Sequence, residues 1–422
     1  MTETTTINGS SPGAPDEARG RERWVVGLIG AGHFLSHFYA LALPPLFPIL
    51  KAQFGVSYLE LGLAMTAYSL LGGILQAPVG FLVDQLGPRR VLLVGLGLNA
   101  AAVMLMGFVD AYWMLLALAV LAGLGNSVFH PADYAILSGS IDPGRLGRAF
   151  SAHTFAGFLG GACAPVGMLA LAHWTDWRTA LIAAGLAGLL VLAVMALRRQ
   201  VLQGEASAEV PEETTAQPAA AENGAAAGLK LILSAPVLLF LLFFIVYGMV
   251  SGGLTAFTVS ALVDHHGLGL DAANAALTGY LFGIVGGIGL GGFIADKFPR
   301  HLFTANASLV LVVAAVLVPA WLDLPGLALI ICMTLTGVGM GAVLPPRDLM
   351  IRAFTPPGQA GKVFGFIFVG YSIGGSAAPV LMGWLLDHGL AAGVFLAAAG
   401  FAVLSLVSVT VAQGLARKRT VG

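Results

Sequence analysis

Five polar side chains recur at helical spacing inside two strongly apolar stretches of the chain. His33 and His37 are four residues apart in the first stretch, and Asn126, His130 and Asp133 follow an i, i+4, i+7 pattern in the second. Side chains at these spacings share one face of a helix. An imidazole exchanges protons near about pH 6.5, and a carboxylate can also carry a proton where water is excluded. We therefore expect these residues to handle protons or a polar substrate, with hydrogen-bonded packing as the alternative for the histidines.

Three further ionisable groups lie in apolar stretches. They are His153, close to a glycine-rich segment, and the adjacent pair Arg347 and Asp348. Ionisable side chains in apolar helices are costly and usually serve a function. Arg347 and Asp348 are thus further candidates for substrate or proton binding. The alternatives are that the Arg347 side chain extends to a nearby aqueous surface and that His153 is a packing residue.

The composition shows what kind of helices must position these groups. Apolar residues make up 58% of the chain and charged residues 10%, against about 25% charged residues in soluble proteins. Such a chain lacks the charged surface of a soluble domain and carries too much apolar surface to stay disordered. Its net charge of -1 and its lack of a basic face argue against nucleic-acid binding. We predict an all-α polytopic membrane protein.

Twelve stretches are long enough to cross a bilayer, since a spanning helix needs about 20 apolar residues. We expect them at 24–50, 58–83, 91–108, 112–138, 149–173, 177–197, 235–263, 272–295, 302–322, 326–351, 362–386 and 391–411. The domain organisation that follows is a cytoplasmic disordered tail (1–23), an N-terminal six-helix half (24–197), a cytoplasmic linker (198–234), a C-terminal six-helix half (235–412) and a cytoplasmic tail (413–422).

The distribution of Lys and Arg predicts the orientation. With both termini in the cytoplasm, 17 of the 20 Lys and Arg residues lie on the cytoplasmic side, as the positive-inside rule requires. We expect a plasma membrane or a bacterial inner membrane. At about 1.5 Å per residue, His33 and His130 then lie roughly 6–8 Å to the cytoplasmic side of the midplane, and Asp133, His153 and Arg347 roughly 12 Å. They would form one polar layer.

The two halves repeat each other. Gly123-Leu-Gly125 recurs 214 residues later as Gly337-Val-Gly339, and Gly147-Arg-Ala-Phe150 recurs at the same offset as Gly361-Lys-Val-Phe364. Two halves of like orientation are typical of transporters that bind substrate between the halves near the midplane. A duplicated membrane protein without transport is the alternative.

The repeat also relates an acid to a base. At the offset of 214, Asp133 corresponds to Arg347. We expect these two side chains to form an ion pair across the cavity when the cytoplasmic side closes; the alternative is that each pairs locally. A buried pair roughly breaks even in free energy, whereas removing one partner is costly. Such a pair suits a switch better than a static brace.

The loop between the second and third spans carries a recognisable motif. Gly80–Arg90 reads Gly-Phe-Leu-Val-Asp-Gln-Leu-Gly-Pro-Arg-Arg and resembles the loop signature of the major facilitator superfamily. Gly292–Arg300 is a weaker copy, in which Pro299 replaces the second glycine. Asn126–Pro131 resembles the fosmidomycin-resistance branch of drug exporters. Ala119 stands where many drug/proton antiporters of the superfamily carry Arg. The proton-linked role of that Arg therefore has no counterpart at this position.

The resemblance implies a conformational latch. Asp84 would dock at the start of the eleventh span, near Lys362, and hold the cytoplasmic side closed. The residues assigned to the latch are Gly80, Asp84, Gly87, Arg89, Arg90, Gly292, Asp296 and Arg300. The alternative for Arg89 and Arg90 is that they only fix the topology.

The resemblance also implies which helices line the cavity. Spans 1, 4, 7 and 10 would do so, with Tyr247, Ser251 and Thr255 of span 7 facing it. Pro44, Pro45 and Pro48 weaken the outer end of span 1, and Pro345 with Pro346 weaken span 10, since proline disrupts a helix.

Other functional classes find little support in the sequence. It contains no phosphate-binding loop, no Cys/His set spaced along the chain for a metal and no nucleophile motif, so we expect neither an enzyme nor a cofactor. We predict a monomeric secondary transporter that works by alternating access, with a small molecule, protons and the lipid bilayer as its partners. Proton-coupled export of a small anionic or amphipathic compound is the leading hypothesis. The alternatives are proton-coupled uptake of a small organic acid and a transporter-like receptor or lipid-handling protein without solute flux.

Overall fold

The computed structural model describes residues 14–202, 230–355 and 360–421, and these residues contain helices and no strands. The helices of the N-terminal half are α1 (Ala14–Ala40), the 3-10 turn η1 (Pro44–Leu46), α2 (Phe47–Phe54), α3 (Tyr58–Ile74), α4 (Gln76–Leu86), α5 (Pro88–Met106), α6 (Tyr112–Asn126), α7 (Phe129–Ser140), α8 (Pro143–Trp174) and α9 (Trp177–Leu197). The helices of the C-terminal half are α11 (Ala235–His266), α12 (Leu270–Lys297), α13 (His301–Trp321), α14 (Gly326–Ala342), α15 (Leu344–Phe354), α16 (Ala360–Asp387) and α17 (Ala391–Val421).

The number of spans agrees with the prediction. In the described part of the chain, eleven helical stretches are long and apolar enough to cross a membrane. The pair α3 and α4, bent by 49° between Ile74 and Gln76, makes a twelfth if it is counted as one span. The all-α membrane fold is thus confirmed.

Several spans are broken, and two of the breaks lie at places related by the repeat. In the first span, helix α1 ends at Ala40, and the span continues as η1 and α2. Pro44, Pro45 and Pro48 lie in this second part. The fourth span breaks between α6 and α7, and the tenth between α14 and α15. At the offset of 214, Phe129 at the start of α7 corresponds to Val343, one residue before α15 begins. The internal repeat therefore includes the break of spans 4 and 10. It does not include the breaks of the first two spans, because their counterparts α11 and α12 are continuous.

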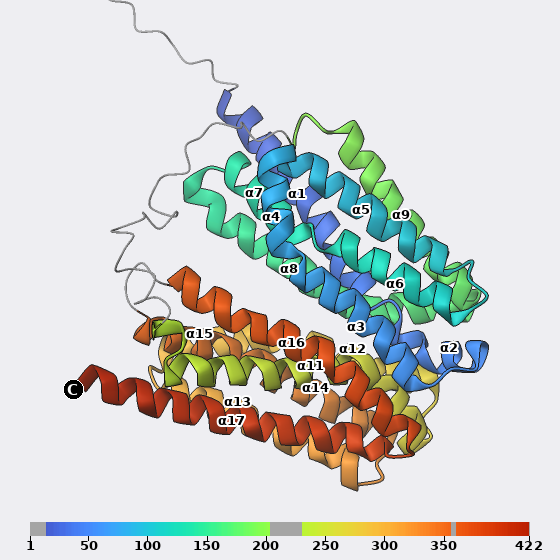
Figure 1. Cartoon of the computed structure of the whole chain (residues 1–422), viewed down its shortest axis with the longest axis vertical. Coiled ribbons are helices and arrows are strands. Elements are labelled where there is room, and N and C mark those ends of the chain that lie inside the picture. The colour runs from blue at the N-terminus through green and yellow to red at the C-terminus, as the bar shows by residue number, and fades with distance from the viewer. Residues whose placement is uncertain (1–13, 203–229, 356–359, 422) are drawn as a thin grey trace, which may run out of the picture.

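The two halves form two helical bundles that meet at one end of the molecule. In Figure 1 the blue-to-green N-terminal bundle and the yellow-to-red C-terminal bundle meet on the right, beside α2, and diverge toward the left, where the C-terminus lies. The main contacts between the halves pair α3 with α16 and α8 with α12. Because α1 runs from the terminal end toward α2, the contacting end is the one opposite the termini.

Specific polar contacts close that end. The carboxylate of Asp387 accepts hydrogen bonds from the backbone N–H groups of Tyr58 and Leu59, both at 2.8 Å, and lies 3.6 Å from the ammonium of Lys51. Farther along α3, the Thr66 hydroxyl donates to the carbonyl of Ser376 at 2.6 Å. Asp387 therefore caps the first turn of α3 from the other half of the molecule.

The chain is helical beyond both of the expected end spans. Helix α1 begins at Ala14, so residues 14–23, expected in a disordered tail, are helical, and α17 continues to Val421 through the expected C-terminal tail. A bidentate contact lies in the N-terminal extension. Glu22 accepts two hydrogen bonds from the guanidinium of Arg145 and one from the backbone N–H of Asp142. The start of α8 thereby contacts the third turn of α1.

Candidate functional site

A buried acid lies among histidines in the N-terminal half. Asp133 on α7 is 0% exposed, and its Oδ2 lies 3.0 Å from Nε2 of His153 on α8 and 3.6 Å from Nδ1 of His33 on α1. The imidazoles of His33 and His153 stack with their ring centroids 3.7 Å apart. Either group can donate in the contact between Asp133 and His153, depending on which of the two carries the proton.

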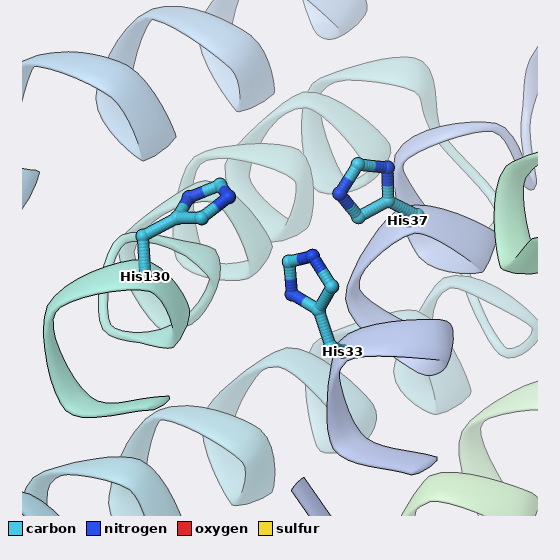
Figure 2. Close-up of side chains that lie close together, drawn as sticks. All are labelled: His33, His37 and His130. Carbon is cyan, nitrogen blue, oxygen red and sulfur yellow. The ribbon is translucent and has the colours of Figure 1, made fainter. Parts of the chain in front are cut away.

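Two more histidines complete the cluster. His37, one turn along α1, lies with its ring 4.7 Å from that of His33, and His130 on α7 lies 5.1 Å from it, centroid to centroid. Figure 2 shows the rings of His33, His37 and His130 around a common space. We call His33, His37, His130, Asp133 and His153 the histidine cluster.

Small residues bring two of the three helices, α1 and α8, close enough to form this cluster. A Cβ atom at Gly160 of α8 would lie 2.0 Å from the carbonyl oxygen of Phe34, and one at Gly157 would lie 2.6 Å from Nε2 of His33. These glycines let α8 approach α1 directly, as small residues do between membrane helices. The break before Phe129 starts α7 anew and places His130 and Asp133 on its first turns.

The cluster has unused hydrogen-bonding capacity. Nδ1 of His33, Oδ1 of Asp133 and Nδ1 of His153 are buried and have no hydrogen-bond partner among the described residues. Leaving a buried polar atom unpaired costs about 1–3 kcal/mol. Such atoms are rare in folded proteins, and each requires an explanation, for example a functional role. The histidine cluster is therefore suited to take up a proton, an ion or a polar ligand.

The base related to Asp133 by the repeat lies in the other half. Arg347 is 4% exposed and donates from Nε and Nη2 to Oδ1 of Asp348 at 3.0 and 2.8 Å. Its guanidinium lies over the ring of Phe244, 4.3 Å from the ring centroid. In this conformation Asp133 and Arg347 each pair locally, which was the alternative to an ion pair across the cavity.

Two other candidates lie apart from these contacts. The Tyr247 hydroxyl is buried and donates to the carbonyl of Met340 at 2.7 Å, within the C-terminal half. Asn126 is half-buried, beside Gly72 of α3, and its Oδ1 has no partner among the described residues. In span 7, the Ser251 hydroxyl lies 3.2 Å from that of Tyr371.

The expected latch residues lie at the diverging end. Gly87 has a φ of 85°, which favours glycine and makes the turn between α4 and α5. Asp84 is exposed. The guanidinium of Arg89 donates to the carbonyl of Arg199 at 3.1 Å. The side chain of Lys362, the expected neighbour of Asp84, lies outside the described side chains.

The remaining latch residues stand near helix ends. Gly80 lies in α4 and Arg90 at the start of α5, whereas Gly292 and Asp296 lie in the last two turns of α12, and Arg300 precedes α13. Arg90, Asp296 and Arg300 are exposed.

Two features of the cluster were not predicted from the sequence. The first is the hydrogen bond between His153 and Asp133, which lie on successive helices. The second is the closeness of His130 to His33 and His37, which are far from it in the chain. The chain spacing alone did not indicate a set that could hold a metal. The glycines of α8 were the available signal, since a close helix contact there brings His153 toward span 1.

Comparison with known proteins supports the transporter architecture. The family model of the Major Facilitator Superfamily matches residues 29–323 and 249–420. The chain is 24% identical over 368 residues to the fosmidomycin resistance protein of Escherichia coli, covering 86% of each chain. It is 25% identical over 359 residues to a probable nitrate/nitrite transporter of Mycobacterium tuberculosis, covering 81% of this chain and 84% of that one.

A solved structure has the same fold. It is a bacterial homologue of the human lysosomal transporter Spinster, in an inward-facing and occupied conformation. The TM-score is 0.75 at 15% identity, and the match covers 97% of this chain and 98% of that one.

Proposed function

The chain belongs to the Major Facilitator Superfamily, and on that premise we propose that it exports a small anionic or amphipathic compound in exchange for protons. The histidine cluster carries this proposal. It holds a fully buried carboxylate whose ion-pair partners among the described residues are histidines rather than Lys or Arg. Imidazole and carboxylate can both gain and lose protons, so the cluster can change its charge during a transport cycle.

The arrangement of the halves supports an alternating-access cycle. The contacts through Asp387 and Thr66 join the halves at the end opposite the termini, and the exposed Asp84 stands at the other end. With both termini in the cytoplasm, as the Lys and Arg distribution predicts, this conformation opens inward. Docking of Asp84 against α16 would then close the cytoplasmic side.

Arg347 is the proposed partner of an anionic substrate. Its guanidinium is buried, whereas the side chain of its partner Asp348 is 44% exposed. A substrate carboxylate or phosphonate arriving from the aqueous side could replace Asp348, because Arg binds such groups through a planar pair of donors. When the inner side closes, Asp133 would form an ion pair with the guanidinium of Arg347. Arg347 would thus pair in turn with Asp348, the substrate and Asp133. Two relatives are a fosmidomycin resistance protein and a probable nitrate/nitrite transporter, which fits anionic or acidic cargo.

A growth-inhibition panel tests export. An efflux-deficient bacterial host would express the protein, Asp133→Asn, or the control Asp110→Asn, whose carboxylate is exposed at the outer end. The panel contains fosmidomycin and chemically varied toxic acids and amphiphiles. We expect the protein and the Asp110 variant to raise the inhibitory concentration of at least one compound, and the Asp133 variant to lose this protection.

The other outcomes separate the alternatives. Increased sensitivity to a toxic acid, dependent on Asp133, would replace export by uptake of an organic acid. If growth does not change, the purified protein is placed in liposomes and the flux of labelled acids is followed across an imposed pH gradient. Specific ligand binding without any flux would reject transport in favour of a receptor-like function.

A further inference from the structure

Three imidazoles of the histidine cluster face one space. A ligand nitrogen from each of His33, His37 and His130 lies within 4.8 Å of the other two. His33 and His37 are four residues apart on α1, the helix spacing that lets two histidines bind one metal ion. In Figure 2, ring nitrogens of His37 and His130 point toward the space above His33. We propose that His33, His37 and His130 form a binding site for one divalent transition-metal ion of the Zn²⁺ class.

The ligand set fits this ion. Imidazole nitrogen is a common ligand of Zn²⁺, Co²⁺, Ni²⁺ and Cu²⁺, whereas Mg²⁺ and Ca²⁺ prefer oxygen. Three protein ligands leave a fourth position of a tetrahedral Zn²⁺ ion for water or another small ligand. With Zn–N distances of about 2.0–2.1 Å, the nitrogens around the ion would be about 3.3 Å apart. Rotation of the half-buried rings of His37 and His130 can supply the required contraction.

A neighbouring carboxylate lies beside one ring and could orient it once an ion binds. Oδ2 of Asp133 lies 3.6 Å from Nδ1 of His33, which leaves Nε2 of that ring for the ion. A metal-bound histidine commonly donates its other N–H to a carboxylate or carbonyl, which orients the ring and makes it a better ligand. Nδ1 of His33 has no hydrogen-bond partner among the described residues in the structure, and a small movement of the ring would bring it to Asp133.

The backbone of α8 leaves room beside the ligand atoms. A Cβ at Gly157 would lie 2.6 Å from Nε2 of His33 and 3.0 Å from Cδ2 of His37. Any side chain at this position would therefore displace the two rings. The absence of one keeps the His33 nitrogen accessible. The metal site thus combines two helix-spaced histidines, a third from α7 and a glycine of α8.

The site goes beyond the proposed transport function and is tested by binding rather than by flux. The full-length protein would be purified in detergent through an affinity tag without histidine, treated with a chelator and titrated with Co²⁺. We expect one Co²⁺ per chain, with visible absorption bands of a tetrahedral nitrogen site that Zn²⁺ removes. His265→Ala alters an exposed histidine at the end of α11 and should leave the titration unchanged.

Ligand variants identify the site. His37→Ala and His130→Ala should abolish stoichiometric binding, and Asp133→Asn should weaken it by about 10–100-fold through His33. His130→Cys provides a readout that a merely structural role would not give. It should restore Co²⁺ binding and add a near-ultraviolet sulfur-to-cobalt band, because thiolate is also a Zn²⁺-type ligand. Elution of each variant as a single peak on size exclusion verifies folding.

Several results would overturn the proposal. They are no saturable Co²⁺ or Zn²⁺ binding by the intact protein, binding unchanged in His37→Ala and His130→Ala, and binding lost in His153→Ala but retained in His37→Ala. The last result would move the ion to His33, Asp133 and His153, which also lie within ligand distance of one another. Loss of metal binding in a protein that still transports its substrate would leave the proposed transport function intact.

Discussion

At the scale of single residues, Asp133 combines complete burial with partners that can themselves change charge. A buried carboxylate paired with Arg would be fixed as an anion, because arginine stays protonated in proteins. Asp133 instead contacts His33 and His153, so the number of protons in this part of the site can change. Arg347 is the complementary case, a buried permanent cation whose acidic partner Asp348 is partly exposed.

Asp133→Asn is expected to uncouple transport from protons. Asparagine keeps the shape of the side chain but cannot release a proton, so accumulation driven by a pH gradient should fall to background. Substrate exchange at equal pH, which needs no net proton movement, should persist. Both are measured in liposomes with labelled substrate. Normal gradient-driven accumulation by this variant would contradict the assignment of Asp133.

Arg347→Ala should selectively weaken the binding of anionic substrates. A hydrogen bond to a charged group contributes about 1.5–3 kcal/mol, which corresponds to a loss of about 10- to 150-fold in affinity. The measurement is the KM for an anionic and a neutral substrate identified by the growth panel. An equal loss for both substrates would instead indicate that Arg347 has a structural role beside Phe244 and Asp348.

At the scale of helices, glycine decides which spans lie in direct contact. Helix α16 carries Gly374, where a Cβ would lie 1.8 Å from the carbonyl oxygen of Ile245 on α11. It also carries Gly365, which is exposed and where a Cβ would meet nothing within 4 Å. The same residue type thus packs two helices together at one position and leaves open space at another.

Gly374→Ala should destabilise the C-terminal half. The added methyl group forces α11 and α16 apart, and overpacking of this kind typically costs about 1–3 kcal/mol. Thermal unfolding in detergent is the measurement. Gly365→Ala on the same helix is the matched control and should melt at or above the temperature of the unaltered protein. Equal melting temperatures of the two variants would show that the contact at Gly374 is not tight.

At the scale of the whole molecule, the two halves are held together at one end by a few specific polar contacts. Asp387 accepts two backbone N–H groups of α3 and lies beside Lys51. At the opposite end, the exposed Asp84 stands near the turn formed by Gly87. Two carboxylates, one in each half, would thus stabilise opposite closed states.

Asp387→Ala should shift the molecule toward opening at the end opposite the termini, because the first turn of α3 loses two charge-assisted hydrogen bonds. Spin labels at Asp110→Cys and Asp323→Cys, on loops of the two halves at the end opposite the termini, report the separation once Cys163 and Cys332 are replaced by serine. We expect a larger share of long distances. Asp84→Ala is the opposite control and should not add long distances. An unchanged distribution in the Asp387 variant would assign closure to other contacts.

The sequence by itself determined the membrane class, the twelve apolar spans, the repeat of the halves and the family, because these follow from composition, segment length and local motifs. It also identified His33, His37, His130 and Asp133, since helical spacing places them on shared faces. Only the tertiary structure decided how α1, α7 and α8 approach one another. The hydrogen bond of His153 to Asp133, the convergence of three imidazoles and the local pairing of Arg347 with Asp348 depend on that approach. Contacts between helices are set by glycine-permitted backbone distances and by the conformation of the two halves, and neither is encoded in the periodicity of a single span.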